Sequence, residues 1–314
     1  MCTAISMGRW FGRTLDYERS FGEEVVFTPR NFPLPFRHVP DLQRHHAILG
    51  MARVEDGYPL YYDAMNGRGL YMAGLNFVHS CRYDNPGTHR IAAFALIPWV
   101  LSQCDDLPQA RTLLSETAIL GEDFSNSLPC ARLHWFLADQ NGAVAVECTA
   151  QGLTIHDDPV GVLTNEPSFE GQLHHLSNFM HLSPAEPINR FSDRLDMKPC
   201  SRGMGAMGLP GDLSSQSRFV RAAFTKLNAE ETDVGQVFRI LGTVEQVKGC
   251  CRLPDGALEY TRYAAVCDGK QGIYYYSTCH NRRITGIAME RENLNGNSLV
   301  RFDLRSGEDI CWQN

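Results

Sequence analysis

Alternating and continuous apolar stretches lie mainly toward the two ends of the chain. Residues 2–6 alternate, so that Cys2 and Ala4 share one face of a predicted strand. Residues 7–9 have the composition of a turn, and we expect residues 10–16 to return as the second strand of a hairpin. Alternation and a high content of β-branched and aromatic residues predict further strands at 23–28, 69–77, 133–139, 143–149, 153–157, 261–268, 272–278 and 283–290.

Helical periodicity occurs between these two groups of strands. We expect one helix over the apolar run 90–103 and a second over 108–119, which has proline in its first turn. Two more helices are expected over 216–228 and 233–247, each with an apolar stripe or a polar N-cap. Strands at both ends with helices between them predict an α+β layered fold. No stretch has the composition of a linker, so we expect a single domain over residues 1–314.

The composition is that of a globular protein with a sizeable core. The 314 residues are 43% hydrophobic and 21% charged, with a formal net charge of −7 and a pI of about 5.9. This charge argues against nucleic acid or an anionic membrane as the main partner. The most apolar stretch, residues 90–101, is too short to span a bilayer, and no secretory signal is visible. We therefore expect a cytoplasmic protein without stable membrane association.

Patterns for metals and cofactors are incomplete. The 11 cysteines include no CxxC pair and no zinc-site spacing, and most are expected to be buried thiols in a reducing compartment. GMGAMG at 203–208 has the spacing of a dinucleotide-binding loop, but Pro210 prevents a following helix, so we interpret it as a flexible loop. The histidine pairs at 45–46 and 174–175 lack metal-binding spacing. We expect neither a metal nor a cofactor.

Cys2 is different because it directly follows the initiator methionine. If Met1 is removed, a single residue carries both a thiol and a free α-amine. An α-amine has an ordinary pKa of about 7.7–8.0, low enough to accept the thiol proton near neutral pH. Such a site also needs a carboxylate, a cation and oxyanion donors. Arg13 and Asp16, on the strand expected to pair with Cys2, are candidates, although alone they also fit an ordinary ion pair at a strand end.

A set of longer motifs extends nearly from end to end of the chain. They are MCT (1–3), FGRTLD (11–16), TPRNF (28–32), AGLNF (73–77), LHWFLAD (133–139), VLTNEP (162–167), GLPGDLSSQSRFVRAAF (208–224) and QGIYYY (271–276). As a set they resemble the choloylglycine hydrolase family, which comprises bile salt hydrolases and penicillin V acylases. The resemblance implies a four-layer αββα sandwich of the N-terminal nucleophile hydrolase type.

The resemblance also implies a set of catalytic residues. Carried over position by position, they are Cys2, Arg13, Asp16, Asn76, Asn165 and Arg218. Cys2 would supply both nucleophile and base, Arg13 and Asp16 would hold the nucleophile, and Arg218 would add cationic support near the thiol. The two asparagines would contact the oxyanion or the substrate, although without the resemblance they also fit loop amides. The turn after Cys2 is several residues shorter than the family pattern, and a change of register would turn side chains to the other face.

The resemblance further suggests a substrate. Asn76 resembles the bile salt branch rather than the penicillin V branch, and CSRGMG (200–205) resembles the version in glycine-preferring bile salt hydrolases. We therefore expect hydrolysis of glycine- or taurine-conjugated bile acids through a thioester, and the resemblance implies a homotetramer. The pocket should be an apolar trough. Its candidate lining residues, which could equally pack in the core, are Met65, Phe77, Phe136 and Met204.

Two alternatives to a bile salt hydrolase remain. A penicillin V acylase, or another N-acyl amide hydrolase of the family, would use the same catalytic residues. A non-catalytic steroid- or lipid-binding protein would bind its ligand without turnover, although all six catalytic positions hold the expected residue types.

Overall fold

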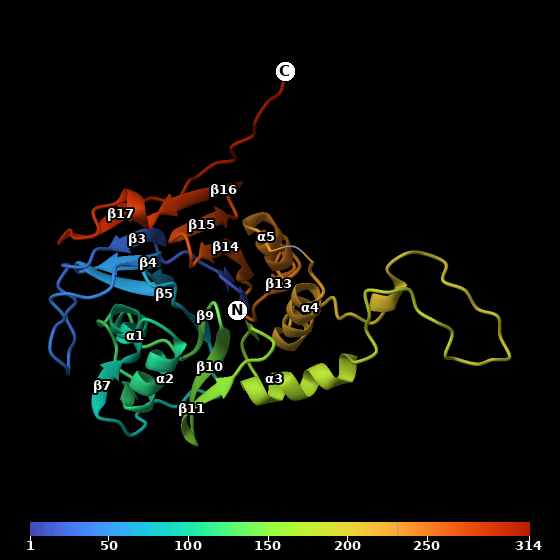
Figure 1. Cartoon of the computed structure of the whole chain (residues 1–314), viewed down its shortest axis with the longest axis horizontal. Helices are drawn as coiled ribbons and strands as arrows, with labels where there is room; N and C mark the ends of the chain where they lie inside the picture. Colours follow the sequence, from blue (N-terminus) through green and yellow to red (C-terminus); the bar gives the residue numbers. More distant parts are fainter. Residues whose placement is uncertain (231) are drawn as a thin grey trace.

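Two large antiparallel sheets form the centre of the computed structural model, which describes residues 1–230 and 232–314 (Figure 1). The first sheet contains β1 (Cys2–Met7), β2 (Trp10–Tyr17), β12 (Val162–Leu163), β13 (Cys251–Arg252), β14 (Leu258–Asp268), β15 (Ile273–Thr278) and β16 (Asn281–Ala288). Its order is β12-β1-β2-β14-β15-β16, and β13 pairs with β14. The N-terminal hairpin therefore lies in the interior of this sheet, between a middle and a C-terminal strand.

The second sheet combines strands from the middle of the chain with one strand near its C-terminus. It contains β3 (Glu24–Thr28), β4 (Ile48–Glu55), β5 (Tyr58–Asn66), β6 (Tyr71–Asn76), β9 (Leu133–Asp139), β10 (Gly142–Thr149), β11 (Gly152–Asp157) and β17 (Val300–Phe302). Its order is β11-β10-β9-β6-β5-β4-β3-β17. β1 contacts β6 and β9, so the two sheets pack face to face around the N-terminal hairpin.

The N-terminal hairpin is present as the alternation predicts. Met7 lies opposite Trp10, so only Gly8 and Arg9 form the turn between β1 and β2. Gly8 has a φ of +57°, a conformation that two-residue hairpin loops require and that glycine adopts without steric cost. The turn is therefore as short as a regular antiparallel hairpin permits.

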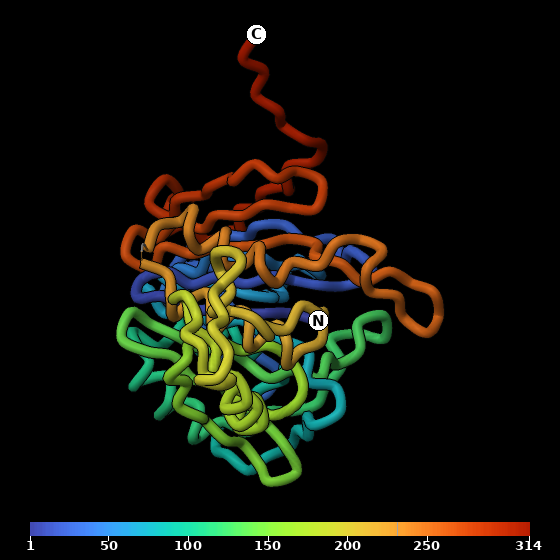
Figure 2. The backbone as a smooth tube through the Cα atoms, turned by 90° about the vertical axis from the view of Figure 1, so that its right-hand side faces the viewer, coloured from blue at the N-terminus to red at the C-terminus, as the bar shows by residue number. Residues whose placement is uncertain are grey.

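Helices cover the outer face of each sheet. The α-helices are α1 (Leu96–Gln103), α2 (Leu107–Ser115), α3 (Phe169–Leu176), α4 (Ser215–Leu227) and α5 (Val234–Gly242), and short 3-10 helices are η1 (Ala93–Ala95), η2 (Ser177–Phe179), η3 (Met204–Ala206) and η4 (Met289–Arg291). α4 and α5 pack on the first sheet, whereas α1 and α2 pack on the second. Figure 2, turned by 90°, shows the blue N-terminal strands between the green middle part and the orange to red C-terminal part. The α+β fold and its four-layer αββα order are thus confirmed.

The expected helices form, but three of them have different bounds, and α5 ends at Gly242 instead of residue 247. α5 begins after Asp233, whose side chain accepts a hydrogen bond from the first turn at 2.7 Å. The stretch 90–103 begins as strand β7 (His89–Ala92), and the stretch 108–119 ends in strand β8 (Thr117–Leu120), which pairs in parallel with β7. Short apolar runs fit a buried strand as well as a helix, and the pairing of distant segments decides between them. None of the helices in the described part of the chain is both long and apolar enough to cross a membrane.

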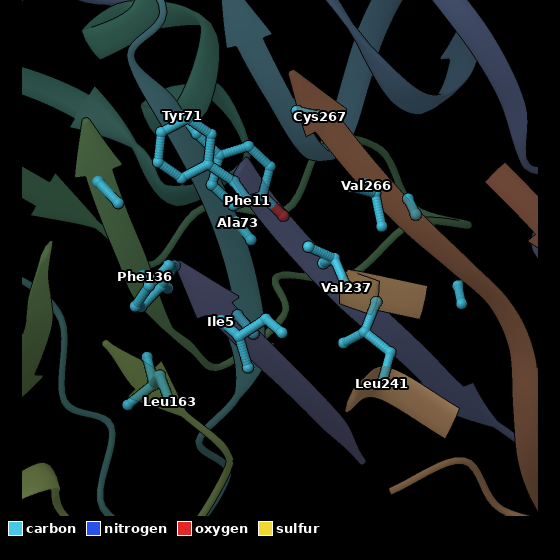
Figure 3. Packing of buried hydrophobic residues seen from close by; sticks show 14 of the residues in the cluster. Ile5, Phe11, Tyr71, Ala73, Phe136, Leu163, Val237, Leu241, Val266 and Cys267 are labelled. Carbon is cyan, nitrogen blue, oxygen red and sulfur yellow. The ribbon is translucent and has the colours of Figure 1, made fainter. Parts of the chain in front are cut away.

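The main hydrophobic core lies between the two sheets and beneath α4 and α5. Figure 3 shows Ile5 and Phe11 of the first sheet near Tyr71 and Phe136 of the second. The rings of Phe11 and Tyr71 are stacked with their centroids 5.4 Å apart. A second core fills the space between the second sheet and the helices α1 and α2. The hairpin that carries Cys2 is thus held in place by packing on both of its faces.

One long segment projects from the sandwich. Residues 180–209, which we call the arm, leave the body after η2 and return before α4, as the yellow trace in Figure 1 shows. The glycine-rich stretch 203–208 lies in the arm and forms a loop with only the short helix η3. The arm carries the strongly exposed apolar side chains Met180, Ile188, Phe191, Leu195, Met197 and Met207.

Candidate active site

Cys2 is the first residue of β1 and lies beside the loop that follows β12. β12 pairs with β1, and this pairing brings Asn165 to the beginning of β1. The backbone N–H of Cys2 donates a hydrogen bond to Asn165 Oδ1 at 2.8 Å. Cys2 is only 2% exposed, and it lines a cavity formed by residues of both sheets. The sulfur therefore lies where a ligand can reach it while bulk water is largely excluded.

The hairpin register decides which side chains share a face with Cys2. Cys2 lies opposite Leu15, and Ala4 lies opposite Arg13. Because directly opposed residues of an antiparallel pair point to the same face, Arg13 points with Cys2 toward the second sheet. Asp16 follows Leu15 directly, so its side chain points to the other face of the hairpin, toward α4. With this short turn, Arg13 thus lies on the face of Cys2 and Asp16 lies on the opposite face of the hairpin.

Arg13 is a completely buried cation on the face of Cys2. Its Nη1 donates hydrogen bonds to two backbone carbonyl groups of the second sheet, at 3.0 and 3.2 Å. Burial opposes the charge, but the neighbouring Tyr263, Cys2 and Asp63 favour it and raise the pKa of Arg13 above its ordinary value overall. Arg13 therefore places a permanent positive charge on the face of the hairpin that carries the Cys2 side chain.

Asp63 balances the charge of Arg13. Its Oδ1 lies 3.8 Å from Arg13 Nη1. The hydroxyl groups of Tyr263 and Tyr274 donate hydrogen bonds to its two carboxylate oxygens at 2.7 and 2.8 Å. The sequence pattern does not single out this residue. One signal is nevertheless present, because a carboxylate in the largely apolar stretch 58–66 requires partners when the strand is buried.

Asp16 lies on the opposite face of the hairpin, where it faces α4. Thr261 Oγ1 donates a hydrogen bond to Asp16 Oδ1 at 2.6 Å, and Gln246 Nε2 donates one to Oδ2 at 3.2 Å. Arg218 Nη1 lies 4.0 Å from the same Oδ2 atom, and both side chains are completely buried. Asp16 therefore pairs with Arg218, whereas Arg13 pairs with Asp63.

Arg218, in the second turn of α4, reaches the backbone of Cys2. Its Nη1 donates hydrogen bonds to the Cys2 carbonyl oxygen at 2.6 Å and to Thr3 Oγ1 at 2.7 Å. Its Nη2 donates to Asn165 Oδ1 at 2.8 Å. Burial lowers the pKa of Arg218, and Asp16 acts in the opposite direction. One guanidinium group thus fixes both Cys2 and the amide that contacts its nitrogen.

Asn165 connects this group to Asn76. Asn165 Nδ2 donates a hydrogen bond to the Asn76 carbonyl oxygen at 2.9 Å. Asn76 ends β6 and lines the same cavity as Cys2. The structure thus brings the six predicted catalytic residues together from β1, β2, β6, the loop after β12 and α4. The catalytic role of each residue stays a prediction.

An apolar cavity of about 220 Å³ opens beside Cys2. Besides Cys2 and Asn76, its lining consists mostly of Leu15, Tyr17, Phe21, Leu60, Tyr61, Tyr62, Phe94, Phe124, Leu128, Pro129, Ala131 and Leu133. A second and more polar cavity shares Tyr17 and Asn76 with the first and is lined by Arg19, Arg132 and the ion pairs Arg53–Glu55 and Arg301–Glu24. The two cavities together favour a ligand with an apolar body and a polar or anionic end.

The four side chains expected to line the pocket do not line this cavity. Met65 and Phe136 are completely buried in the core between the sheets, and Phe77 stacks on a buried histidine with ring centroids 4.3 Å apart. Met204 lies in the arm. Large apolar residues in central strands pack in the core, whereas the observed lining comes from β2, β5 and the loop 121–132. The alternation of β2 is the signal that identifies part of this lining, since it places Leu15 and Tyr17 on the face of Cys2.

A family model described as linear amide C–N hydrolases, choloylglycine hydrolase family, matches residues 2–302. The chain belongs to the choloylglycine hydrolase family. A bile salt hydrolase/transferase of Lactiplantibacillus plantarum is 46% identical over 98% of each chain. A conjugated bile acid hydrolase of Lactobacillus gasseri is 33% identical over 96% of this chain and 100% of the relative.

Solved structures agree with this choloylglycine hydrolase assignment. A mutant conjugated bile acid hydrolase from Clostridium perfringens superimposes with a TM-score of 0.94 and 31% sequence identity over the whole of both chains. Penicillin V acylase from Agrobacterium tumefaciens gives a TM-score of 0.76 at 21% identity, over 98% of this chain and 92% of the acylase, and shares the fold. The chain is therefore a linear amide C–N hydrolase with the N-terminal nucleophile hydrolase fold.

Met1 precedes Cys2 in this choloylglycine hydrolase. Its α-ammonium group donates a hydrogen bond to the Asp16 carbonyl oxygen at 2.6 Å and lies 3.1 Å from Glu259 Oε2. While Met1 is attached, the nitrogen of Cys2 is an amide and cannot accept a proton. The contact with Glu259 links β1 to β14, and no local pattern in the sequence indicates it.

Proposed function

We propose that the chain hydrolyses the amide bond of glycine- or taurine-conjugated bile acids. The observation that carries the proposal is the position of Cys2 in an apolar cavity, with Asn76 shared between this cavity and a neighbouring one that bears Arg19 and Arg132. A conjugated bile acid has an apolar steroid body, a central amide bond and an anionic end, in the order that these two cavities require. The similarity to relatives named as bile salt hydrolases supports the same substrate.

The reaction requires removal of Met1. The freed α-amine of Cys2 then accepts the thiol proton, and the sulfur attacks the carbonyl carbon of the substrate amide. The amine returns this proton to the leaving nitrogen as the C–N bond breaks, which releases glycine or taurine and leaves a thioester on Cys2. Water then attacks the thioester, gives its proton to the thiolate through the amine, and releases the bile acid.

The residues around Cys2 have separate tasks in this mechanism. Asn165 orients the nitrogen of Cys2, and Arg218 holds both of them. Arg13 provides positive charge on the face of the sulfur. Asn76 contributes to the position at which the substrate carbonyl is held. Another amine could also attack the thioester in place of water, so N-acyl transfer is a further reaction of the same intermediate.

We also propose that the protein works as a homo-oligomer in the cytoplasm, with tetramer as the expected state. The projecting arm supports oligomerisation, because monomers rarely expose this many large apolar side chains in one segment. The 11 free thiols support a reducing compartment. Strands from both ends of the chain share each sheet, and this supports a single domain over residues 1–314.

The test is to assay glycocholate, taurocholate and penicillin V for released amine. We expect cleavage of both bile acid conjugates, with the glycine conjugate preferred. Cys2→Ala should lower the rate by at least about 10³-fold, because it removes the nucleophile. Cys311→Ala, at an exposed site, is the matched control and should keep full activity. An N-terminal mass measurement on the same sample should find Cys2 as the first residue.

Other outcomes identify the alternatives. Cleavage of penicillin V alone would make the chain an acylase of another branch of the family. Bile acid binding without turnover, unchanged in the Cys2→Ala variant, would make it a binding protein. Full activity with Met1 still attached would exclude the amine as the base.

A further inference from the structure

The amine of Met1 occupies a site built from buried acidic and polar atoms. Its nitrogen lies 2.6 Å from the Asp16 carbonyl oxygen and 3.1 Å from Glu259 Oε2. Glu259 is only 7% exposed, and its second oxygen, Oε1, is buried without a hydrogen-bond partner in the described part of the chain. The carboxylate of Glu259 thus depends on a cation at the start of the chain.

Removal of Met1 changes the surroundings of Glu259, and the inference rests here on the proposed function. A buried carboxylate that loses its partner is strongly destabilised unless another donor replaces it. Successive backbone nitrogens lie about 3.5 Å apart, so the position of the Met1 nitrogen is close to the new α-amine of Cys2. A water at this position would have three polar partners, namely the amine, the Asp16 carbonyl oxygen and Glu259.

We propose that in the processed protein Glu259 is a positioning residue for the α-amine of Cys2. One water at the former position of the Met1 nitrogen connects the two groups, and through it Glu259 holds the amine and stabilises its ammonium form. Glu259 then acts on the nucleophile only through the amine. It determines the pH range in which the amine is free to accept the thiol proton.

The other charged groups near this position do not favour the protonated amine of Cys2 as Glu259 does. The carboxylate of Asp16 is already bonded to Thr261 and Gln246 and faces Arg218. Arg218 of α4, a nearby cation, disfavours a second positive charge and thus acts against the ammonium form. Arg13 of β2, on the face of the Cys2 side chain, is a second cation that acts in this direction. Tyr17 of β2 and Cys251 of β13 are further titratable neighbours. Glu259 therefore carries the negative charge that favours the protonated amine.

The experiment titrates the amine directly. Protein labelled with ¹⁵N-cysteine gives one α-amine resonance that is well separated from the backbone amide resonances of the other cysteines. We expect Glu259→Gln to lower the pKa of this amine by about one pH unit, since it removes a nearby opposite charge. The acid limb of the kcat/KM profile for glycocholate should move by the same amount. At a pH below both pKa values, the variant should then have about tenfold more neutral amine than the wild type.

Two further variants separate this role from a structural one. Glu259→Asp keeps the charge and should restore the wild-type titration at least in part, even if the glutamine variant folds poorly. Glu116→Gln removes an exposed carboxylate at the end of α2, on the second sheet, and should leave the titration unchanged.

The result that overturns the inference is an amine titration and an acid limb that are the same in the wild type and in Glu259→Gln. A wild type that shows the Glu259-dependent titration but cleaves neither bile acid conjugate would overturn the proposed function and leave the inference standing. A Cys2 nitrogen that remains an amide in the purified active protein would overturn both.

Discussion

Asp158 illustrates how a single buried carboxyl group can support the strand next to β1, which carries Cys2. It is 6% exposed and accepts hydrogen bonds from the backbone N–H groups of Val160, Gly161 and Val162 at 2.7–3.0 Å. Val162 begins β12, the strand that pairs with β1 and carries the chain to Asn165. Burial raises the pKa of Asp158 to about 6, although these backbone groups and a nearby lysine act in the opposite direction.

This pKa predicts a specific dependence of stability on pH. The folded protein holds a proton on Asp158 up to about pH 6, whereas the unfolded chain loses it near 3.8. The stabilising contribution is therefore complete below 3.8 and is lost as the pH rises through 6. Between pH 7 and pH 5 the wild type should gain about 1 kcal/mol relative to Asp158→Asn. Urea unfolding of both proteins at the two pH values measures this difference.

The control is Asp193→Asn, which changes an exposed carboxylate of the arm. The stability of this variant should follow that of the wild type at both pH values. A difference between the wild type and Asp158→Asn that does not change with pH would contradict the prediction.

At the scale of residues, the sequence identifies what is local and the structure adds what is distant. The pairing of Cys2 with the strand of Arg13 and Asp16 follows from a hairpin of fewer than 20 residues. Asn165 and Arg218 reach Cys2 across 163 and 216 positions of the chain, and only the family resemblance indicates them. The family resemblance does not indicate Asp63 or Glu259, because their partners become apparent only when the strands have been placed side by side.

At the scale of elements, the close approach of β4 and β5 fixes the strand that carries Asp63. A Cβ atom added to Gly50 would lie 2.1 Å from the Asp63 carbonyl oxygen and 2.5 Å from the Ala64 Cα. These are backbone atoms, which cannot move without displacing the strand. Gly50→Ala should therefore lower the free energy of unfolding by at least about 2 kcal/mol, at the upper end of overpacking effects. It should also reduce activity, because displacement of Asp63 disturbs Arg13.

Chemical denaturation and the bile acid assay measure the two effects of Gly50→Ala. The matched control is Gly142→Ala at the start of β10, where the added atom would lie 3.8 Å from its nearest neighbour and should cost little. Equal stabilities of the two variants would show that β4 and β5 can separate locally without loss of packing.

At the same scale, several strands are predictable because their residues are rich in apolar, β-branched and aromatic side chains, as buried strands are. Residues 133–139 coincide with β9, and residues 153–157 fall within β11. β4 and β5 were not predicted, since their apolar and polar residues do not alternate regularly around the bulge between Met51 and Ala52. The parallel pair β7–β8 is also not apparent, because a parallel partner far along the chain leaves no local trace.

At the scale of the whole molecule, the sandwich is closed by segments that are distant in sequence, whereas the arm lies outside it. β1 and β2 pair with β12 and β14, and β17 covers the edge of the second sheet at β3. This interleaving makes the body depend on both ends of the chain. The arm adds no strand to the two sheets in the described part of the chain, and it presents apolar side chains to solvent. These apolar side chains therefore do not pack in the core of this chain.

In the proposed oligomer, the arm of one copy of the chain contacts a second copy. Ile188 and Phe191 are 70% and 81% exposed, and burying them against another copy would supply the apolar area that an interface needs. Replacing both with aspartate should convert the oligomer into smaller species in light scattering coupled to size exclusion. Ile310→Asp, at a 60% exposed isoleucine of the C-terminal tail, should leave the mass unchanged. The Ile188→Asp/Phe191→Asp protein should still fold and cleave substrate, because the six residues around Cys2 lie within one sandwich. If its mass is the same as that of the wild type, the arm does not join the subunits.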